Sequence, residues 1–108
     1  MHSISIAKDF SITPGARYRR EGKWSGEEFY EDILLPAFIA AQQAGVKLMI
    51  DLDGTSGYAT SFLEQAFGTL AIKFGIDEVQ DRLSFKTIDE PLLEEEIDEY
   101  ITHAASTQ

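Results

Sequence analysis

The run from Val46 to Leu52 constrains the fold more than any other part of the chain, because only Lys47 and Asp51 in it are charged. An apolar run of this length directly after a helical pattern is typical of a central β-strand that is covered on both faces. A chain of 108 residues is long enough to bury one modest core and too short for two. We therefore predict a single domain over residues 1–108, built around this strand.

Strand and helix patterns alternate on either side of the central strand. Alternating apolar and polar residues predict three more strands, at residues 4–9, 16–20 and 82–88. Apolar residues spaced three and four apart predict three helices, at residues 25–44, 61–74 and from Pro91 onward. The order ββαβαβα predicts an α/β fold, with a mixed sheet of about four strands and three helices packed against it.

Local signals mark where the first two helices begin, bend and end. Ser25 and Ser61 are each followed three residues later by Glu, which is the spacing of a capping box and predicts a helix start at both places. Gly45 predicts a left-handed stop for the first helix. Pro36 lies inside that helix and lacks the N–H of one backbone hydrogen bond, so we expect a kink or two shorter helices there.

The balance of charge excludes some classes of partner. With 19 acidic and 9 basic side chains the formal charge is −10, which repels phosphate backbones and anionic membranes. We therefore expect neither nucleic acid nor a membrane as a partner.

The absence of cysteine fits a reducing compartment, and no stretch approaches the ~20 apolar residues of a membrane span, so we expect a cytoplasmic protein. His2 and His103 lack a third ligand at useful spacing, so we expect no metal.

The stretch from Asp51 to Ser61 joins the central strand to the second helix, and ligands or partners gather at such strand ends. Its beginning, Asp51-Leu52-Asp53-Gly54-Thr55, resembles the nucleophile motif of haloacid-dehalogenase-like phosphatases. That resemblance implies a magnesium-dependent enzyme in which Asp51 attacks phosphorus, Asp53 acts as acid and base, and Thr55 lies behind them. This alternative depends on one short motif in the middle of the chain.

Three separated motifs support a different reading. They are residues 22–29 (GKWSGEEF), residues 34–37 (LLPA), and residues 51–54 (DLDG) together with 61–68 (SFLEQAFG). In this order they resemble the STAS-like bacterial domain family of unknown function, which is related to the STAS domains of anti-sigma factor antagonists. The resemblance implies a STAS-like fold and a regulatory protein-interaction domain that has no catalytic residues and no cofactor.

In anti-sigma factor antagonists, a serine at the start of the second helix is phosphorylated by a histidine-kinase-like ATPase, which is also the binding partner. Ser61 is the matching position, and Thr60 precedes it. The resemblance thus implies Ser61 or Thr60 as the phosphorylation candidate, while the capping box gives Ser61 a purely structural role; both roles can hold together.

We expect the partner-binding surface on the loop before Ser61, with contributions from Asp53, Thr55, Ser56, Tyr58, Thr60 and Ser61. Tyr58 stands among glycine and other small residues, so we expect its side chain to be exposed. Trp24 lies beside Arg20 and Lys23 and can either cover the edge of the core or anchor a partner. An exposed strand edge leaves a homodimer open as well.

Overall fold

Three parallel strands form the sheet in the computed structural model, which describes residues 2–106. They are β1 (Ser3–Ser5), β2 (Leu48–Asp51) and β3 (Leu83–Lys86), and β2 lies between the other two. Ile4 is paired with Ile50 in one register and Ile50 with Phe85 in the other. The central position of the predicted strand is therefore confirmed.

Helices occupy most of the remaining chain. Their bounds are α1 (Ile6–Asp9), α2 (Gly26–Phe29), η2 (Tyr30–Leu34), α3 (Leu35–Ala44), α4 (Thr60–Leu63), η3 (Glu64–Gly68), α5 (Thr69–Phe74), α6 (Ile76–Arg82) and α7 (Leu93–Ser106), with a 3₁₀ turn η1 (Arg19–Glu21). The segments η2 and η3 are π-helical turns that continue their neighbours without a break. The described residues therefore form five helices, at 6–9, 26–44, 60–74, 76–82 and 93–106.

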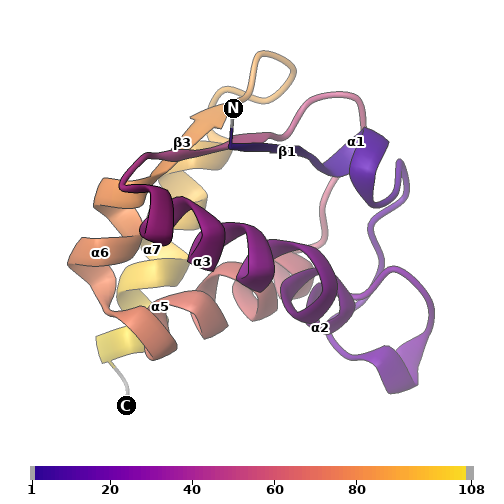
Figure 1. The fold of residues 1–108 in the computed structure, drawn as a ribbon. Coiled ribbons are helices and arrows are strands. Elements are labelled where there is room, and N and C mark those ends of the chain that lie inside the picture. The colour runs from indigo at the N-terminus through magenta and orange to yellow at the C-terminus, as the bar shows by residue number, and fades with distance from the viewer. Residues whose placement is uncertain (1, 107–108) are drawn as a thin grey trace.

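The long helices all lie on one side of the sheet (Figure 1). Burial alternates along the strands accordingly: Ile4 and Ile50 point into the core and are almost fully buried, whereas Ser3 and Lys86 are exposed. No helix covers the opposite face within residues 2–106. The prediction that the central strand is covered on both faces is wrong, because half of its side chains face away from the helices.

The predicted sheet of about four mixed strands with three helices is corrected to three parallel strands and five helices. Residues 16–20 do not form a strand, because they find no partner strand and end in the 3₁₀ turn η1. The first strand ends at Ser5, since the hydroxyl of Ser5 accepts a hydrogen bond from the N–H of Lys8 and so starts α1.

The helix at 26–44 does not divide into two helices at Pro36, but a π-helical turn interrupts its regular α-helical hydrogen bonding just before the proline. The π-helical turn η2 directly precedes the proline, and the N–H of Leu35 donates to the carbonyl of Tyr30, five residues back. Widening of the turn before Pro36 lets the helix continue past the ring. Gly45 then ends the helix with φ of 68°, as predicted.

Aromatic side chains form the centre of the core. The fully buried ring of Phe29 lies 5.7 Å from the ring of Phe62 and 6.4 Å from that of Phe67, centroid to centroid. Phe85 of β3 packs against Phe67, and Phe10 packs against Phe29. Burial of each such side chain contributes roughly 1.5–3 kcal/mol, so this cluster accounts for much of the hydrophobic stabilisation.

Among residues 2–106, no helix combines the length and apolar content needed to cross a membrane.

Close approach of two helices depends on Gly26. A Cβ atom at this position would lie 2.6 Å from the carbonyl oxygen of Phe62, a backbone atom that cannot move without shifting α4. We predict that Gly26→Ala lowers the free energy of unfolding by about 1–3 kcal/mol, the usual result of overpacking, although alanine is the better helix former. Urea denaturation measures the change.

Gln43→Ala, at an exposed position in α3, is the matched control and should leave stability within about 0.5 kcal/mol of the wild type. A Gly26→Ala variant as stable as the wild type would show that α2 and α4 do not approach as closely as described.

Candidate functional site

Two loops meet at the carboxyl ends of β2 and β3, and the carboxylate of Asp53 holds them together. Its Oδ1 accepts hydrogen bonds from the N–H groups of Ile88 and Asp89 at 2.8 and 2.9 Å, and its Oδ2 lies 3.1 Å from the N–H of Ile88. In return, Asp89 Oδ2 accepts from the N–H of Gly54 at 3.1 Å. We call this reciprocal pair the carboxylate clamp.

The clamp lowers the pKa of Asp53. The N–H of Asp89 is the main cause and that of Ile88 adds to it, because both stabilise the charged carboxylate; nearby Lys86 contributes a smaller attraction, and partial desolvation opposes them. Asp53 is thus ionised at neutral pH, with both oxygens directed at backbone groups of the neighbouring loop. The sequence motif made Asp53 a candidate catalytic acid and base, but in the structure its carboxylate holds the loop between β3 and α7.

Asp51 also turns its carboxylate toward the protein. Its Oδ1 accepts a hydrogen bond from the N–H of Asp53 at 3.0 Å, and its Oδ2 lies 3.7 Å from the ammonium of Lys86. The sequence interpretation missed Lys86 and Asp89 as members of this group. Only the register that pairs Asp51 with Lys86 brings them together, and no local pattern in the sequence specifies that register.

Tyr58 differs from its predicted exposure. Its hydroxyl donates to the carbonyl of Leu52 at 2.7 Å, and its ring lies 6.0 Å from that of Phe62, so the side chain is half-buried at the edge of the core. Burial raises the pKa of Tyr58 to about 12, and the nearby carboxylates of Asp51 and Asp53 add to the rise. The phenol is therefore neutral at physiological pH. Its hydrogen bond to Leu52 links the loop to the end of β2.

Thr55 and Ser56 form the outer part of the same loop. The Thr55 hydroxyl accepts from the N–H of Gly57 at 3.3 Å, and the N–H of Ser56 donates to the carbonyl of Ile12 at 2.8 Å. The side chain of Ser56 is exposed and that of Thr55 is half-buried. Both predicted contact residues thus lie at the surface of a loop whose backbone is held on two sides.

The two candidate hydroxyls stand at the beginning of α4. Ala59, and not Ser61, is the N-cap of this helix, and no side chain caps it. The predicted capping box at Ser61 is therefore wrong, whereas Ser25 does cap α2 by accepting from the N–H of Glu28 at 3.0 Å. Thr60 is exposed and Ser61 half-buried, so Thr60 offers the more accessible hydroxyl.

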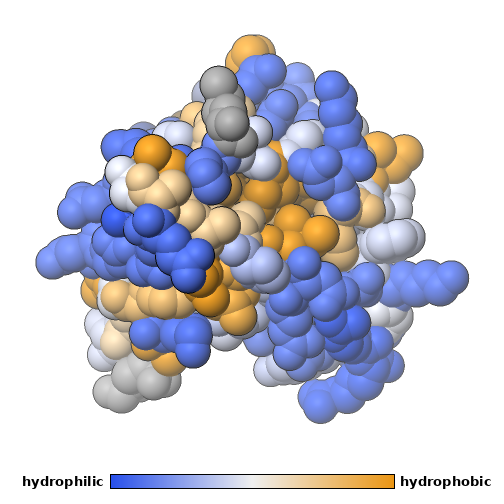
Figure 2. Space-filling view, in the orientation of Figure 1, coloured by the Kyte–Doolittle hydropathy of each residue, from blue (hydrophilic) through white to orange (hydrophobic). Residues whose placement is uncertain are grey.

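Two exposed aliphatic side chains flank the clamp. Ile88 is 73% exposed and Leu92 65% exposed, on the loop between β3 and α7 that rises above the sheet in Figure 1. Figure 2 shows apolar atoms at the tip of the same loop. The sequence predicts the last helix from Pro91 onward, but α7 begins at Leu93 and leaves Leu92 outside the core. We call Thr55, Ser56, Ile88 and Leu92 the carboxyl-edge surface.

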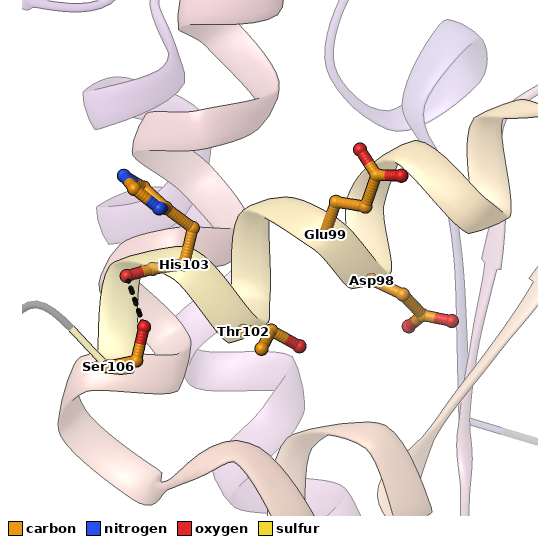
Figure 3. A pocket seen from close by; sticks show the side chains of 5 residues that line it. All are labelled: Asp98, Glu99, Thr102, His103 and Ser106. Atoms are coloured by element: carbon orange, nitrogen blue, oxygen red, sulfur yellow. Dashed lines mark hydrogen bonds between the residues drawn. The ribbon is translucent and has the colours of Figure 1, made fainter.

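A separate shallow pocket of about 420 Å³ lies along the second half of α7. Figure 3 shows the side chains of Asp98, Glu99, Thr102, His103 and Ser106, which all come from this one helix and do not converge on a common point. Partial burial raises the pKa of Asp98. Within the described part of the chain, no group of three His, Cys, Asp or Glu side chains is arranged to hold a metal ion.

Parallel strands with helices on one side, and loops gathered at the carboxyl ends of the strands, are consistent with the STAS-like class of α/β domain. A family model described as "STAS-like domain of unknown function (DUF4325)" matches residues 25–93, well over half of the chain. The chain belongs to this family, as its three motifs predicted. No curated protein and no solved structure matches it significantly.

The carboxylate clamp predicts a local effect of Asp53→Ala. Removal of the acceptor frees the N–H groups of Ile88 and Asp89, so we expect their protection against amide hydrogen exchange to fall by about tenfold or more. Because the clamp lowers the pKa of Asp53, the ionised carboxylate stabilises the folded protein fully when the pH is above the ordinary carboxyl pKa near 3.8. This stabilisation is lost as the pH falls through the lower pKa that Asp53 has in the folded protein. Protection of both amides should therefore decline in acid.

Asp77→Ala, on the exposed side of α6, removes the same charge elsewhere and should leave the two amides protected. Equal exchange rates in Asp53→Ala and the wild type would contradict the clamp.

Proposed function

We propose that this protein is a non-catalytic regulatory interaction domain whose carboxyl-edge surface binds another protein. One observation carries the proposal: Ile88 and Leu92 remain largely exposed on a loop whose backbone the clamp holds in place. Exposed aliphatic side chains on a fixed loop lose little conformational entropy on binding, which favours association. The neighbouring hydroxyls of Thr55 and Ser56 supply polar contacts at the rim.

The proposed partner is a histidine-kinase-like ATPase, by the resemblance to anti-sigma factor antagonists, and the proposed switch is phosphorylation of Ser61 or Thr60. A phosphate adds about −1.5 to −2 charge at neutral pH. At the first turn of a helix a negative charge meets the positive end of the helix dipole, so the domain stays folded while the surface beside the carboxyl-edge residues changes its charge. The exposure of Thr60 supports it as the first residue to test.

Engagement of both carboxylates supports a role without catalysis. The oxygens of Asp53 accept hydrogen bonds from backbone N–H groups, and Asp51 is shared between the N–H of Asp53 and Lys86. A nucleophilic aspartate needs a free oxygen in line with the substrate and an acid beside it. The hydrogen bonds of Asp51 and Asp53 thus favour a structural role for these two residues over the catalytic role that the phosphatase-like motif implies.

The first test replaces the two aliphatic side chains. We predict that Ile88→Ser with Leu92→Ser abolishes recovery of the partner ATPase from a lysate of the native host, because the apolar contacts are lost. Val46→Ser with Ile72→Ser, which removes two aliphatic side chains of 43% and 45% exposure elsewhere, should leave recovery unchanged. Thr60→Asp and Ser61→Asp should weaken recovery if phosphorylation is the switch.

Recovery of the ATPase at the wild-type level by the Ile88→Ser, Leu92→Ser variant would contradict the proposed surface. Recovery of no ATPase by the wild-type protein would contradict the proposed partner. Thermal unfolding of each variant shows whether the domain remains folded.

The second test concerns catalysis. We predict that the protein does not hydrolyse a panel of phosphate esters in the presence of magnesium above the rate of an Asp51→Asn variant, because both aspartates already accept hydrogen bonds from the backbone. Release of inorganic phosphate is the measurement. Turnover that requires magnesium and is lost in Asp51→Asn would establish the phosphatase alternative in its place.

A further inference from the structure

The loop between α1 and α2 projects from the body of the molecule. In Figure 1 it stands apart from the helices and carries the 3₁₀ turn η1, and Figure 2 shows hydrophilic side chains in the same place. This loop precedes residues 25–93, the part of the chain that the family model matches. The start of the loop touches the carboxyl-edge surface, because the N–H of Ser56 donates to the carbonyl of Ile12. The turn η1 itself lies far from the β3–α7 loop (Figure 1).

Polar contacts, more than an apolar interior, hold the projection in shape. The guanidinium of Arg19 is 3.0 Å from Glu31 and 2.9 Å from Asp32, and Arg17 is 2.7 Å from Glu64. Backbone bonds close the loop at its base, where the N–H of Gly15 donates to the carbonyl of Trp24 at 2.7 Å and the N–H of Gly26 donates to that of Ala16 at 2.9 Å. The loop is thus tied to α2, η2 and η3 at several points.

Two cations of the loop, Arg20 in η1 and Lys23 beside its base, are left over from this network. Within residues 2–106, neither Arg20 nor Lys23 forms an ion pair, although the protein carries ten more negative than positive charges. The guanidinium of Arg20 lies 4.6 Å from the centroid of the Tyr18 ring. A stacked guanidinium is restricted in its rotamers while its N–H groups remain free to bind an anion.

Trp24 completes this group. It is 40% exposed, although one side of its ring packs edge-on against Phe10. It is also the only residue other than glycine with a positive φ, 64°, among those the structure describes. Such backbone strain persists only where the surroundings enforce it, and it concentrates at binding sites. The N–H of Trp24 also donates a hydrogen bond to a carboxylate oxygen of Glu28 at 3.1 Å.

We propose that Tyr18, Arg20, Lys23 and Trp24 form a second binding site, which takes an acidic protein segment with apolar side chains between its carboxylates. The free edge of Arg20 pairs with a carboxylate in a two-pronged arrangement, Lys23 attracts a second, and the exposed face of Trp24 covers an apolar side chain. Tryptophan, tyrosine and arginine are the residue types that contribute most to binding at protein interfaces.

The observations favour a protein segment over nucleic acid. Two unpaired cations neutralise few phosphates, and the net charge of −10 repels an extended polyanion along its length. A short acidic segment can contact this loop without lying along the rest of the acidic surface, and its apolar side chains gain from contact with the indole.

The test measures binding of a short fluorescein-labelled peptide in which Glu and Leu alternate, by fluorescence anisotropy with the full chain. We expect the wild type to bind it and to bind the same peptide with Lys in place of Glu far more weakly. Arg20→Glu with Lys23→Glu should weaken binding by at least about tenfold. Trp24→Ala should weaken it as well, with circular dichroism confirming that the variant is folded.

Lys47→Glu with Lys73→Glu is the matched control, because it changes the net charge equally at exposed cations away from the loop, and it should bind like the wild type. The Ile88→Ser, Leu92→Ser variant should also bind normally, which separates this site from the proposed function. Absence of binding by the wild type, an equal loss in the control, or preferential binding of labelled single-stranded DNA would each overturn the proposal.

Discussion

One-sided burial of a three-stranded parallel sheet is the constraint on which the rest of the structure depends. Parallel strands require a crossover after each strand, and here both crossovers are helical and lie on the same face. All-parallel sheets are ordinarily covered on both faces, so this one must obtain its stability from a single layer of contacts. The row formed by Ile4, Ile50 and Phe85 provides that layer, with the aromatic cluster beneath it.

The same arrangement determines where the loops go. Because all three strands run in the same direction, the segments that leave them emerge together at one edge, and the short strands leave much of the connecting chain outside the sheet. A loop with exposed backbone needs partners for its N–H groups. Asp53 and Asp89 supply them across the two loops, which turns a pair of acidic residues into a structural element.

The sequence predicted those parts of the fold that depend on regular apolar spacing. The central strand, the helices at 26–44 and 60–74 and the buried residues of α7 all follow from such spacing. The prediction from spacing failed at residues 16–20, where Arg17 and Arg19 occupy alternate positions as in a strand. In the structure these two side chains form ion pairs with acidic residues of η3 and η2. Local spacing also cannot show that Asp53 binds amides 35 and 36 residues away, because the pairing exists only after β2 and β3 align.

Contacts on either side of the start of α4 lead to both the carboxyl-edge surface and the projecting loop between α1 and α2. Glu64, one helical turn after Ser61, holds Arg17 and with it the projecting loop, while Ser56 on the other side is bound to the carbonyl of Ile12. The Arg17–Glu64 pair is about one third exposed, and pairs of this kind contribute only about 0–1 kcal/mol. The two Arg19 ion pairs and the backbone bonds at Gly15 and Gly26 hold the projecting loop as well, so the position of this loop does not depend on the Arg17–Glu64 pair alone.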